Sequence, residues 1–168
     1  MRSQNIGWAE LLLDEVVFID EQTHATFLAT ELKYSDVLLN ITGASIGRSA
    51  VVDERIVGGN VNQHVCIIRT NSDELDAHYL SEYLVSDYGQ IQIDEFQAGG
   101  NRQGLNFAQI RSFAIPIPPA PKEQQTIADV LRASNDLITA QASKVDLLKT
   151  HKRGLIQGLF LSQEQVAS

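Results

Sequence analysis

Apolar residues fall in short clusters over the first two thirds of the chain and in one long, regularly spaced series over the last third. Steps of four, seven and three residues keep that series on one face of a helix. Its positions are Ile127, Leu131, Ile138, Val145, Leu148, Leu155 and Leu159. A second set, Val130, Leu137, Leu147 and Ile156, widens this face. The pattern predicts one helix from Lys122 to Phe160, roughly 58 Å long at about 1.5 Å per residue.

The start of this helix is marked by a proline-rich segment, 115–121. Proline ends a strand because it lacks the amide donor, yet it fits the first turn of a helix. Glu123 then suits the positive end of the helix dipole. Globular helices usually end by about 20 residues. We therefore favour an assembly surface in a two-helix or four-helix arrangement, and the alternative is a terminal helix folded back on its own core.

The first two thirds predict an α+β fold, a small twisted mixed β-sheet with short helices. Short β-branched or apolar runs predict strands at 15–19, 37–41, 49–52, 64–69 and 113–117. Helices are predicted at 77–86, capped by 71–74, and at 88–96 and 105–110, with a possible helical turn within 20–32. The predicted division is a globular domain at 1–119, a long helix at 120–161 in a coiled-coil-like pair, and a flexible tail at 162–168.

The net charge of −8 argues against simple binding of nucleic acid. Residues 1–120 hold seven Lys and Arg against sixteen Asp and Glu, and residues 121–168 hold six against five. A domain that neutralises many phosphates by itself should be basic. Any DNA binding must therefore use a local patch or share the work with a partner.

The predicted cellular compartment rests on the apolar runs and the cysteine content of the sequence. The chain contains no run of about 18 apolar residues, so no membrane span is predicted. No apolar signal region follows the first arginine. The single cysteine, Cys66, lies in an apolar run and is expected to be a buried strand residue in a reducing compartment. These features predict a cytoplasmic protein.

Four polar clusters carry side chains that could read DNA. Glycines let a backbone approach phosphate closely, Asn and Gln can bond adenine, and Arg can bond guanine. The candidates are Thr42, Ser45 and Arg48; Asn60, Asn62 and Gln63; Asn101, Arg102 and Gln103; and Arg2, Gln4 and Asn5. The plainer alternatives are a hairpin loop for the first cluster, a solvated turn for the second and a mobile loop for the third.

Catalytic interpretations find little support. Residues 43–47 match the letters of a Gly-x-Ser-x-Gly elbow with Ser45 as nucleophile, but an extended segment rather than a helix follows. His24, His64, His78 and His151 lack metal-ligand spacing, so no metal site is predicted. No Asn-Pro-Pro-aromatic or Asp-Pro-Pro-aromatic motif is present to hold a flipped adenine.

Five segments in order resemble the specificity subunits of type I restriction–modification systems. They are Arg2–Ile6, Asp36–Leu39, Thr42–Gly47, the Pro-Pro element followed by Glu123-Gln124, and the helix closing with Lys152, Leu155 and Leu159-Phe160. Members usually have further sequence before the first of these segments. The resemblance thus implies a half-length or truncated subunit with one target recognition domain, incomplete at its N-terminus, and one conserved helix.

The resemblance implies a non-catalytic role in recognising double-stranded DNA, with one domain reading half of a bipartite target. Modification subunits would dock on the helix and carry S-adenosylmethionine, and a restriction subunit that uses ATP and Mg²⁺ would join indirectly. No cofactor is expected in this chain. A single helix predicts a homodimer with antiparallel helices. The rival hypothesis is an assembly module that binds no DNA, and a hydrolase using Ser45 is a third.

Overall fold

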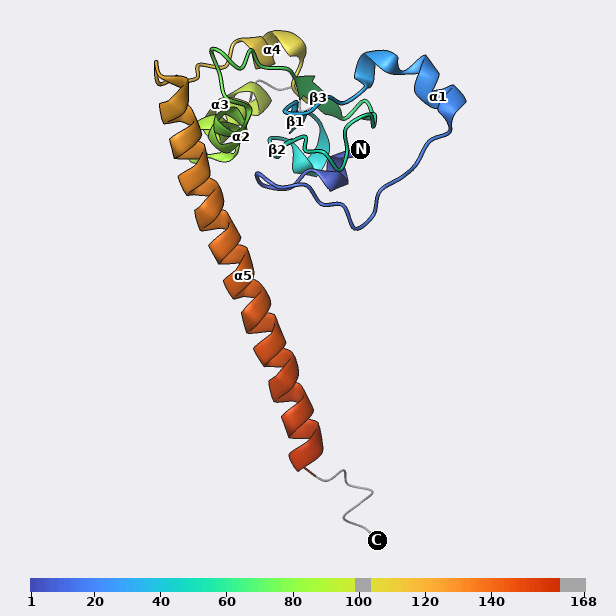
Figure 1. Ribbon diagram of the computed structural model, residues 1–168, viewed down its shortest axis with the longest axis vertical. Coiled ribbons are helices and arrows are strands. Elements are labelled where there is room, and N and C mark those ends of the chain that lie inside the picture. The colour runs from blue at the N-terminus through green and yellow to red at the C-terminus, as the bar shows by residue number, and fades with distance from the viewer. Residues whose placement is uncertain (99–103, 161–168) are drawn as a thin grey trace. The chain divides into compact units, whose positions relative to one another are not determined.

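The computed structural model describes residues 1–98 and 104–160. The chain divides into two units, Met1–Ala128 and Asp129–Ser168. The elements are the 3₁₀ turns η1 (Ser3–Asn5), η2 (Leu28–Thr30) and η3 (Gly43–Ser45), the strands β1 (Val37–Asn40), β2 (Ser49–Val51) and β3 (Val65–Ile68), and the helices α1 (Glu21–Thr26), α2 (Ala77–Val85), α3 (Asp87–Ala98), α4 (Phe107–Arg111) and α5 (Pro121–Leu159) (Figure 1). The predicted α+β class, with a long C-terminal helix, is confirmed.

The sheet has three strands in the order β2–β1–β3, and both pairings are antiparallel. Leu38 of the central strand lies opposite Ala50 on one side and Ile67 on the other. All four β1 residues are buried, which explains its uninterrupted apolar run. The sheet was predicted to be mixed, but the only parallel pairing among the described residues is an isolated bridge between Trp8 and Ser49.

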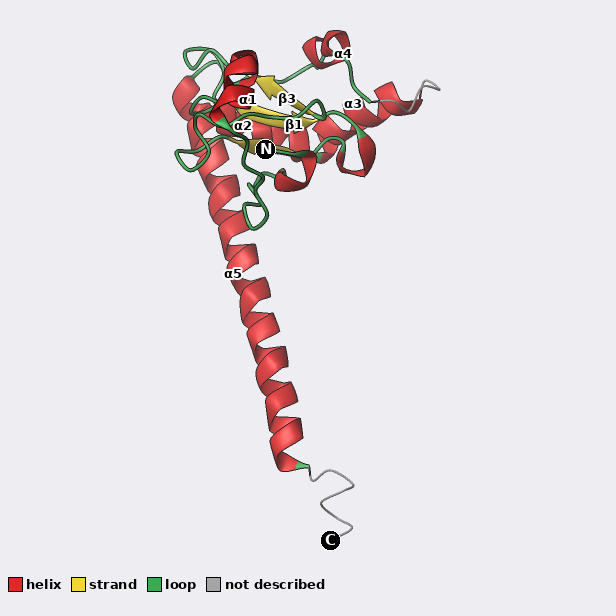
Figure 2. Ribbon diagram, turned by 90° about the vertical axis from the view of Figure 1, so that its right-hand side faces the viewer, coloured by secondary structure: helices red, strands yellow, loops and turns green. Residues whose placement is uncertain are grey.

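The core forms on both faces of β1 because successive strand residues point to opposite sides. Val37 and Leu39 pack in a cluster with residues of α2 and α3, including Leu84 and Ile93. Leu38 packs in a second cluster that includes Ile6. Figure 2 shows the strands with helices beside them and loop segments across them. The sheet is thereby held between helices and the N-terminal segment.

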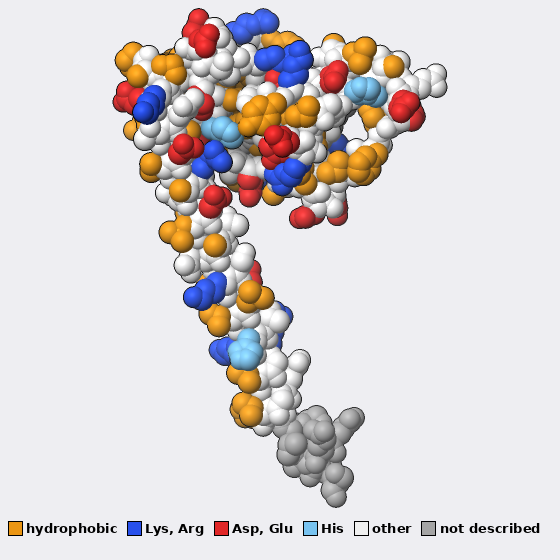
Figure 3. All heavy atoms as spheres, in the orientation of Figure 1, with side chains coloured by type: hydrophobic (Ala, Val, Ile, Leu, Met, Phe, Trp, Pro, Cys, Tyr) orange, Lys and Arg blue, Asp and Glu red, His pale blue; other side chains and the backbone are white. Residues whose placement is uncertain are grey.

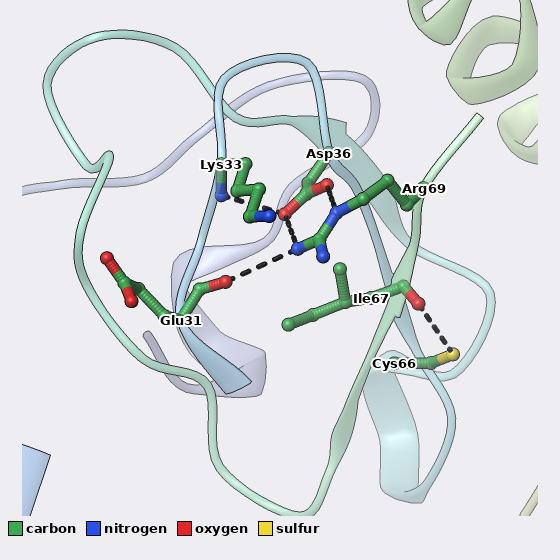
Figure 4. A network of polar contacts seen from close by, with 6 residues as sticks. All are labelled: Glu31, Lys33, Asp36, Cys66, Ile67 and Arg69. Carbon is green, nitrogen blue, oxygen red and sulfur yellow. Dashed lines mark hydrogen bonds and ion pairs between the residues drawn. The ribbon is translucent and has the colours of Figure 1, made fainter. Parts of the chain in front are cut away.

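An ion pair between a buried carboxylate and a half-exposed guanidinium joins the start of β1 to the end of β3 (Figure 4). Asp36 is almost wholly buried, and its two carboxylate oxygens each lie 2.7 Å from a guanidinium nitrogen of Arg69. The backbone amide of Lys33 donates a third hydrogen bond to Asp36. This contact holds the pKa of Arg69 above its ordinary value. The pair fixes the loop that leads into β1.

Two predicted strands are wrong. Residues 15–19 form no ladder, and Phe18 is 89% exposed, because no described segment offers a neighbouring strand. Residues 113–117 are extended without strand pairing, and side chains of Tyr79, Tyr83 and Gln92 bond their backbone instead. The cap of α2 also differs from the prediction: Asp76, not the 71–74 segment, accepts the capping hydrogen bond from Tyr79.

The first two turns of α5 belong to the first compact unit, where Gln124 and Ala128 are buried. The first compact unit therefore ends at Ala128, inside the helix. From residue 129 to 160 every side chain is exposed in the single chain. Ile138, for example, is 66% exposed, and apolar side chains recur along α5 (Figure 3). The predicted tail, 162–168, lies outside the described residues.

Candidate nucleic-acid interface

The end of β1 is where segments from distant parts of the sequence meet. Ile41, the residue after β1, donates its amide hydrogen to the carbonyl of His64 at 3.0 Å. Its own carbonyl accepts a hydrogen bond from the amide of Leu105 at 2.8 Å. These two bonds bring together the loops that follow β1, precede β3 and precede α4. The first and second predicted polar clusters therefore adjoin each other here, together with the backbone of Leu105.

The side chains at this junction are also bonded to one another. The hydroxyl of Thr42 lies 2.7 Å from Nδ1 of His64. Nε2 of the same ring lies 3.3 Å from Nε2 of Gln63. His64 thus links the first and second candidate clusters. His64 was not among the predicted DNA contacts, although it directly follows Gln63.

Gly104 makes the approach of the third loop to β1 possible. Its φ of +120° lies in a region that favours glycine, and a Cβ there would meet the carbonyl oxygen of Ile41 at 2.4 Å. The chain thus returns against β1 immediately after residue 103. Asn101, Arg102 and Gln103, three of the predicted DNA contacts, lie outside the described residues.

The N-terminal cluster reaches the same end of the sheet. The side-chain amide of Asn40 donates to the carbonyl of Ser3 at 2.8 Å, and the backbone amide of Asn62 donates to the carbonyl of Met1 at 3.1 Å. Gln4 is exposed, with its amide 3.4 Å from the carboxylate of Glu15. The fourth candidate cluster therefore adjoins the second.

Two of the predicted DNA contacts, Asn5 and Asn60, make hydrogen bonds within the fold instead. Asn5 is 1% exposed, its side-chain amide donates to the carbonyls of Leu12 and Glu15, and its side-chain oxygen accepts from the amide of Arg2. Asn60 is partly buried, with its oxygen 2.6 Å from Nδ1 of His24. Its amide nitrogen donates to the carbonyl of Phe27. These bonds stabilise turns, so we leave Asn5 and Asn60 out of the proposed contacts.

The remaining candidates differ in how open they are. Gln63 is exposed, whereas Thr42, Ser45, Arg48 and Asn62 are half-buried. The side-chain oxygen of Asn62 accepts the amide of His64 at 3.1 Å, which shapes the turn before β3. Ser45 ends η3, where Gly43 takes a φ of +77°. The open polar groups therefore lie on the loops, and the buried ones hold the loops in place.

Arg48 is held by an aromatic partner that sequence analysis missed. The centre of its guanidinium lies 5.8 Å from the centroid of the Trp8 ring, within the range of a cation–π contact. Trp8 is 51% exposed and is tied to the sheet by its bridge to Ser49. A stacked guanidinium is oriented in advance, which favours recognition of a planar or anionic partner.

Some buried polar atoms at this end of the sheet have no hydrogen-bond partner within residues 1–98 and 104–160. They are Nε of Arg2, Oδ1 of Asn40 and Nε of Arg48. A buried polar group without a partner costs about 1–3 kcal/mol. Such groups call for an explanation, and a functional role is one.

A cavity of about 1030 Å³ adjoins the second cluster. It lies between the extended segment 16–19 and the turn 55–63, and Phe27 forms part of its wall. Most of the surface that lines it is apolar.

Within the described part of the chain, no group of three or more His, Cys, Asp or Glu side chains could hold a metal ion. No described helix is long and apolar enough to cross a bilayer.

The loop around Ser45 does not match a nucleophile elbow. Such an elbow places the serine between a strand and a helix of a large parallel sheet. Here Ser45 lies between β1 and β2, which are antiparallel neighbours in a three-stranded sheet. The geometry therefore gives no support to a hydrolase.

Comparison with known proteins identifies relatives over nearly the whole chain. Two curated relatives come from Methanocaldococcus jannaschii: the specificity subunit of the type I restriction enzyme MjaX, 22% identical over 95% of this chain, and that of MjaVIII, 20% identical over 99%. These matches cover 38% and 40% of the relatives. The chain thus spans about two fifths of their length.

Two solved structures share the fold. One, from a study of complex assembly and conformational transition of the type I R-M system, superimposes with a TM-score of 0.69 at 14% identity. That match covers 96% of this chain and 43% of the other. The HsdS subunit from Thermoanaerobacter tengcongensis gives a TM-score of 0.61 at 16% identity, with coverage of 94% and 40%.

A family model described as the type I restriction modification DNA specificity domain matches residues 19–148. The match includes the sheet, the polar junction at the end of β1 and much of α5. It is to a specificity domain, in agreement with the names of the two curated relatives. The chain belongs to the type I restriction–modification DNA specificity family.

Proposed function

We propose that this chain is the sequence-reading component of a type I restriction–modification complex. It reads one half of a bipartite DNA target and docks modification subunits through α5. The observation that carries this proposal is the meeting of three polar segments, 1–4, 42–48 and 60–64, at the end of β1 in a chain of the specificity family. Loops held at a sheet end by internal bonds are suited to contact base edges and phosphates.

The proposed DNA contacts are the open or half-buried polar side chains of this junction. They are Arg2, Gln4, Thr42, Ser45, Arg48, Asn62 and Gln63, to which the sequence adds Asn101, Arg102 and Gln103. Arg48 combines a cationic head with a fixed orientation on Trp8. A Gln side chain such as that of Gln63 can bond adenine in the major groove.

The acidity of residues 1–120 requires help from a partner. Seven Lys and Arg against sixteen Asp and Glu leave this part strongly negative, so its net charge repels a polyanion. We expect modification subunits to supply most of the phosphate contacts while this chain supplies sequence selectivity. S-adenosylmethionine, and ATP with Mg²⁺, would be held in partner subunits.

Fluorescence anisotropy with labelled duplex DNA tests this proposal. The chain alone should bind weakly, and affinity should rise strongly in the complex with modification subunits and fall as salt is raised. Arg48→Ala should weaken cognate binding in the complex by about 1–3 kcal/mol if the side chain pairs with a base. Arg55→Ala, which removes an exposed arginine outside both α5 and the proposed contacts, is the matched control.

The two variants separate recognition from general charge effects. If Arg48 contacts phosphate only, Arg48→Ala should weaken cognate and random duplexes alike and reduce the salt slope by about 1. Equal affinities of the native and Arg48→Ala complexes for cognate DNA would remove Arg48 from the interface. Tight sequence-specific binding by the isolated chain in physiological salt would contradict the need for a partner.

We also propose that two copies pair through α5. The apolar seam, Ile127 to Leu159, is largely exposed in the single chain, and water disfavours such a surface. An antiparallel pair of identical helices closes the seam with two-fold symmetry. Two identical recognition units would then read an interrupted palindrome.

A second candidate function is an assembly module that binds no DNA. The acidic balance of residues 1–120 and the long exposed seam of α5 favour it. The two functions differ in one measurement, since an assembly module should bind modification subunits without changing the DNA sequence that they select.

A further inference from the structure

Trp8 lies in the turn of a tight hairpin formed by residues 6–11. Ile6 and Leu11 pair across this hairpin in an antiparallel bridge. Ala9, the next residue after Trp8, takes a φ of +60°, a left-handed conformation that alanine rarely adopts. Residues in such conformations cluster where a protein binds or acts, so the hairpin is a candidate functional element.

The hairpin is anchored to the sheet directly beside Trp8. Trp8 forms a parallel bridge with Ser49, and the amide of Ala9 donates to the carbonyl of Ser49 at 2.9 Å. Ser49 is fully buried, and its hydroxyl oxygen lies 3.1 Å from that of Ser81 in α2. Trp8 is nevertheless 51% exposed. It is therefore a large aromatic side chain that a fixed backbone presents to solvent.

Arg48, the partner of Trp8, has a fixed backbone and an incompletely bonded side chain. Its carbonyl accepts the amide of Asn40 at 2.9 Å, and its amide donates to the carbonyl of Ser45 at 3.2 Å. Its guanidinium carbon lies 5.8 Å from the centroid of the Trp8 ring. Nε of Arg48 is buried, and no group within residues 1–98 and 104–160 accepts its hydrogen. This unused donor points to an acceptor that a ligand supplies.

DNA offers two kinds of acceptor to a guanidinium, a phosphate oxygen and the edge of guanine. A phosphate contact carries no sequence information, whereas O6 and N7 of guanine accept two parallel hydrogen bonds from a correctly oriented guanidinium. Stacking on an aromatic ring orients the planar guanidinium before DNA arrives. The contact between Arg48 and Trp8 therefore favours guanine over phosphate.

We propose that Trp8 is a positioning residue for sequence reading, which holds the guanidinium of Arg48 in the orientation that bonds O6 and N7 of one guanine in the target. The inference rests on the proposed function and adds a role for Trp8 and a base for Arg48. Trp8, Arg48 and their anchors all lie within the first compact unit, Met1–Ala128. Without the ring, Arg48 keeps its charge and its attraction to phosphate but loses its selectivity for guanine.

Binding of base-substituted DNA by the complex with modification subunits tests this. Each guanine of the half-site that the complex methylates is replaced in turn by 7-deazaguanine, which lacks the N7 acceptor, and fluorescence anisotropy measures the affinity. We expect one position at which the substitution weakens binding by the native complex about tenfold. Trp8→Leu and Arg48→Ala should each abolish the effect at that position.

Two further variants serve as controls. Tyr34→Leu removes an exposed aromatic ring from the turn before β1, at the other end of the strand, and should keep the tenfold effect. Trp8→Phe should also keep most of it, because phenylalanine retains an aromatic face for the guanidinium. Trp8→Leu should leave the affinity for random duplexes and its salt slope unchanged, since the charge of Arg48 remains. A merely structural role of Trp8 would instead weaken all duplexes alike.

A spectroscopic measurement covers the case in which Trp8→Leu does not fold. The sequence has one tryptophan, so labelling this chain with 5-fluorotryptophan gives a single ¹⁹F signal in a complex with unlabelled modification subunits. Cognate DNA should shift this signal. Cognate DNA with 7-deazaguanine at the sensitive position should shift it less.

Several results would overturn the proposal. They are a half-site in which no guanine is sensitive to the substitution, full sensitivity in Trp8→Leu, and a ¹⁹F signal that cognate DNA leaves unchanged. Equal weakening of cognate and random duplexes by Trp8→Leu would also overturn it, because Arg48 would then contact phosphate only. If the native complex prefers no defined sequence, the proposed function itself fails, which is a distinct result.

Discussion

At the scale of single residues, the polar side chains of this protein divide into those that hold loops and those that the loops present. Asn5, Asn60 and Asp36 are bonded inside the fold, whereas Gln63 and Arg48 lie on the junction at the end of β1. Sequence alone could not separate the two groups, because an asparagine in a polar segment looks the same whether its amide faces a carbonyl or a base. Burial makes the distinction.

The Asp36–Arg69 pair should matter for stability. Arg69→Leu leaves a buried carboxylate with the Lys33 amide but without its cation, and we expect the free energy of unfolding to fall by about 2–3 kcal/mol. The matched control is Arg55→Leu, which breaks the exposed pair with Asp53 and should cost less than about 1 kcal/mol. Urea denaturation of both variants measures this. Equal losses of unfolding free energy would show that the Asp36–Arg69 pair contributes no more to stability than the exposed Asp53–Arg55 pair.

Cys66 should be protected by the fold. Burial raises the pKa of its thiol, since the thiolate is disfavoured away from water. The folded state therefore holds this proton more tightly than the unfolded chain. The resulting stability is fully present below the ordinary thiol pKa and is lost as pH rises through the raised one. At pH 8, Ellman's reagent should react slowly with the native protein and quickly in urea. A native rate equal to the rate in urea would contradict the burial of this thiol.

At the scale of elements, hydrophobic periodicity predicted the central strands and the helices well. β1, β3, α2, α3 and α5 lie within a few residues of their predicted ranges. The two failures are segments that look like strands but have no ladder. Residues 16–19 are β-branched or aromatic, yet a strand also needs a neighbouring strand, which local sequence does not specify. Prolines interrupt the segment around residues 113–117, and side chains of Tyr79 and Gln92 make hydrogen bonds to its backbone in place of a neighbouring strand.

The site was predictable in part for the same reason. The glycine-rich and amide-rich loops could be found from composition, but their meeting at Ile41 depends on pairings between residues far apart in sequence. Trp8 and His64 were missed because each acts through a spatial neighbour, Arg48 for one and Thr42 for the other. Gln124 was noted only as part of a resemblance, and its burial gives it a physical role.

The seam of α5 can be tested directly. Ile138→Asp combined with Val145→Asp places two charges in the centre of the proposed helix pair, where burial without partners should cost several kcal/mol of dimer stability, about 3 or more. Ser143→Asp with Thr150→Asp is the control, because these exposed positions share the spacing of seven but lie on the opposite face. Light scattering at about 50 µM should show a dimer for the native chain and the control, and a monomer for the seam variant.

A native chain that stays monomeric under those conditions would contradict the homodimer. The interrupted palindrome would then fail with it, since one recognition unit reads one half-site. The docking of modification subunits on α5 would still stand as a separate proposal, testable by the same seam variant in a pull-down with those subunits.

At the scale of the whole molecule, the small acidic unit is proposed to contact DNA and the long helix is proposed to bind partners. The first unit, Met1–Ala128, has a rigid sheet whose polar loops meet at one end, and the helix carries an apolar seam that the single chain leaves open. Neither part alone explains tight DNA binding. Together they suit a protein that confers sequence selectivity on partners that bring the positive charge and the chemistry.

The most direct test of this account is a map of adenine methylation. The chain is expressed with modification subunits in a host that lacks N6-adenine methylation, and the genome is sequenced for modified adenines. We expect methylation at one bipartite motif, two inverted half-sites at a fixed spacing, and we expect it to disappear when this chain is omitted. Methylation without a defined motif, or with the same motif in the absence of the chain, from a complex shown to be assembled, would contradict it.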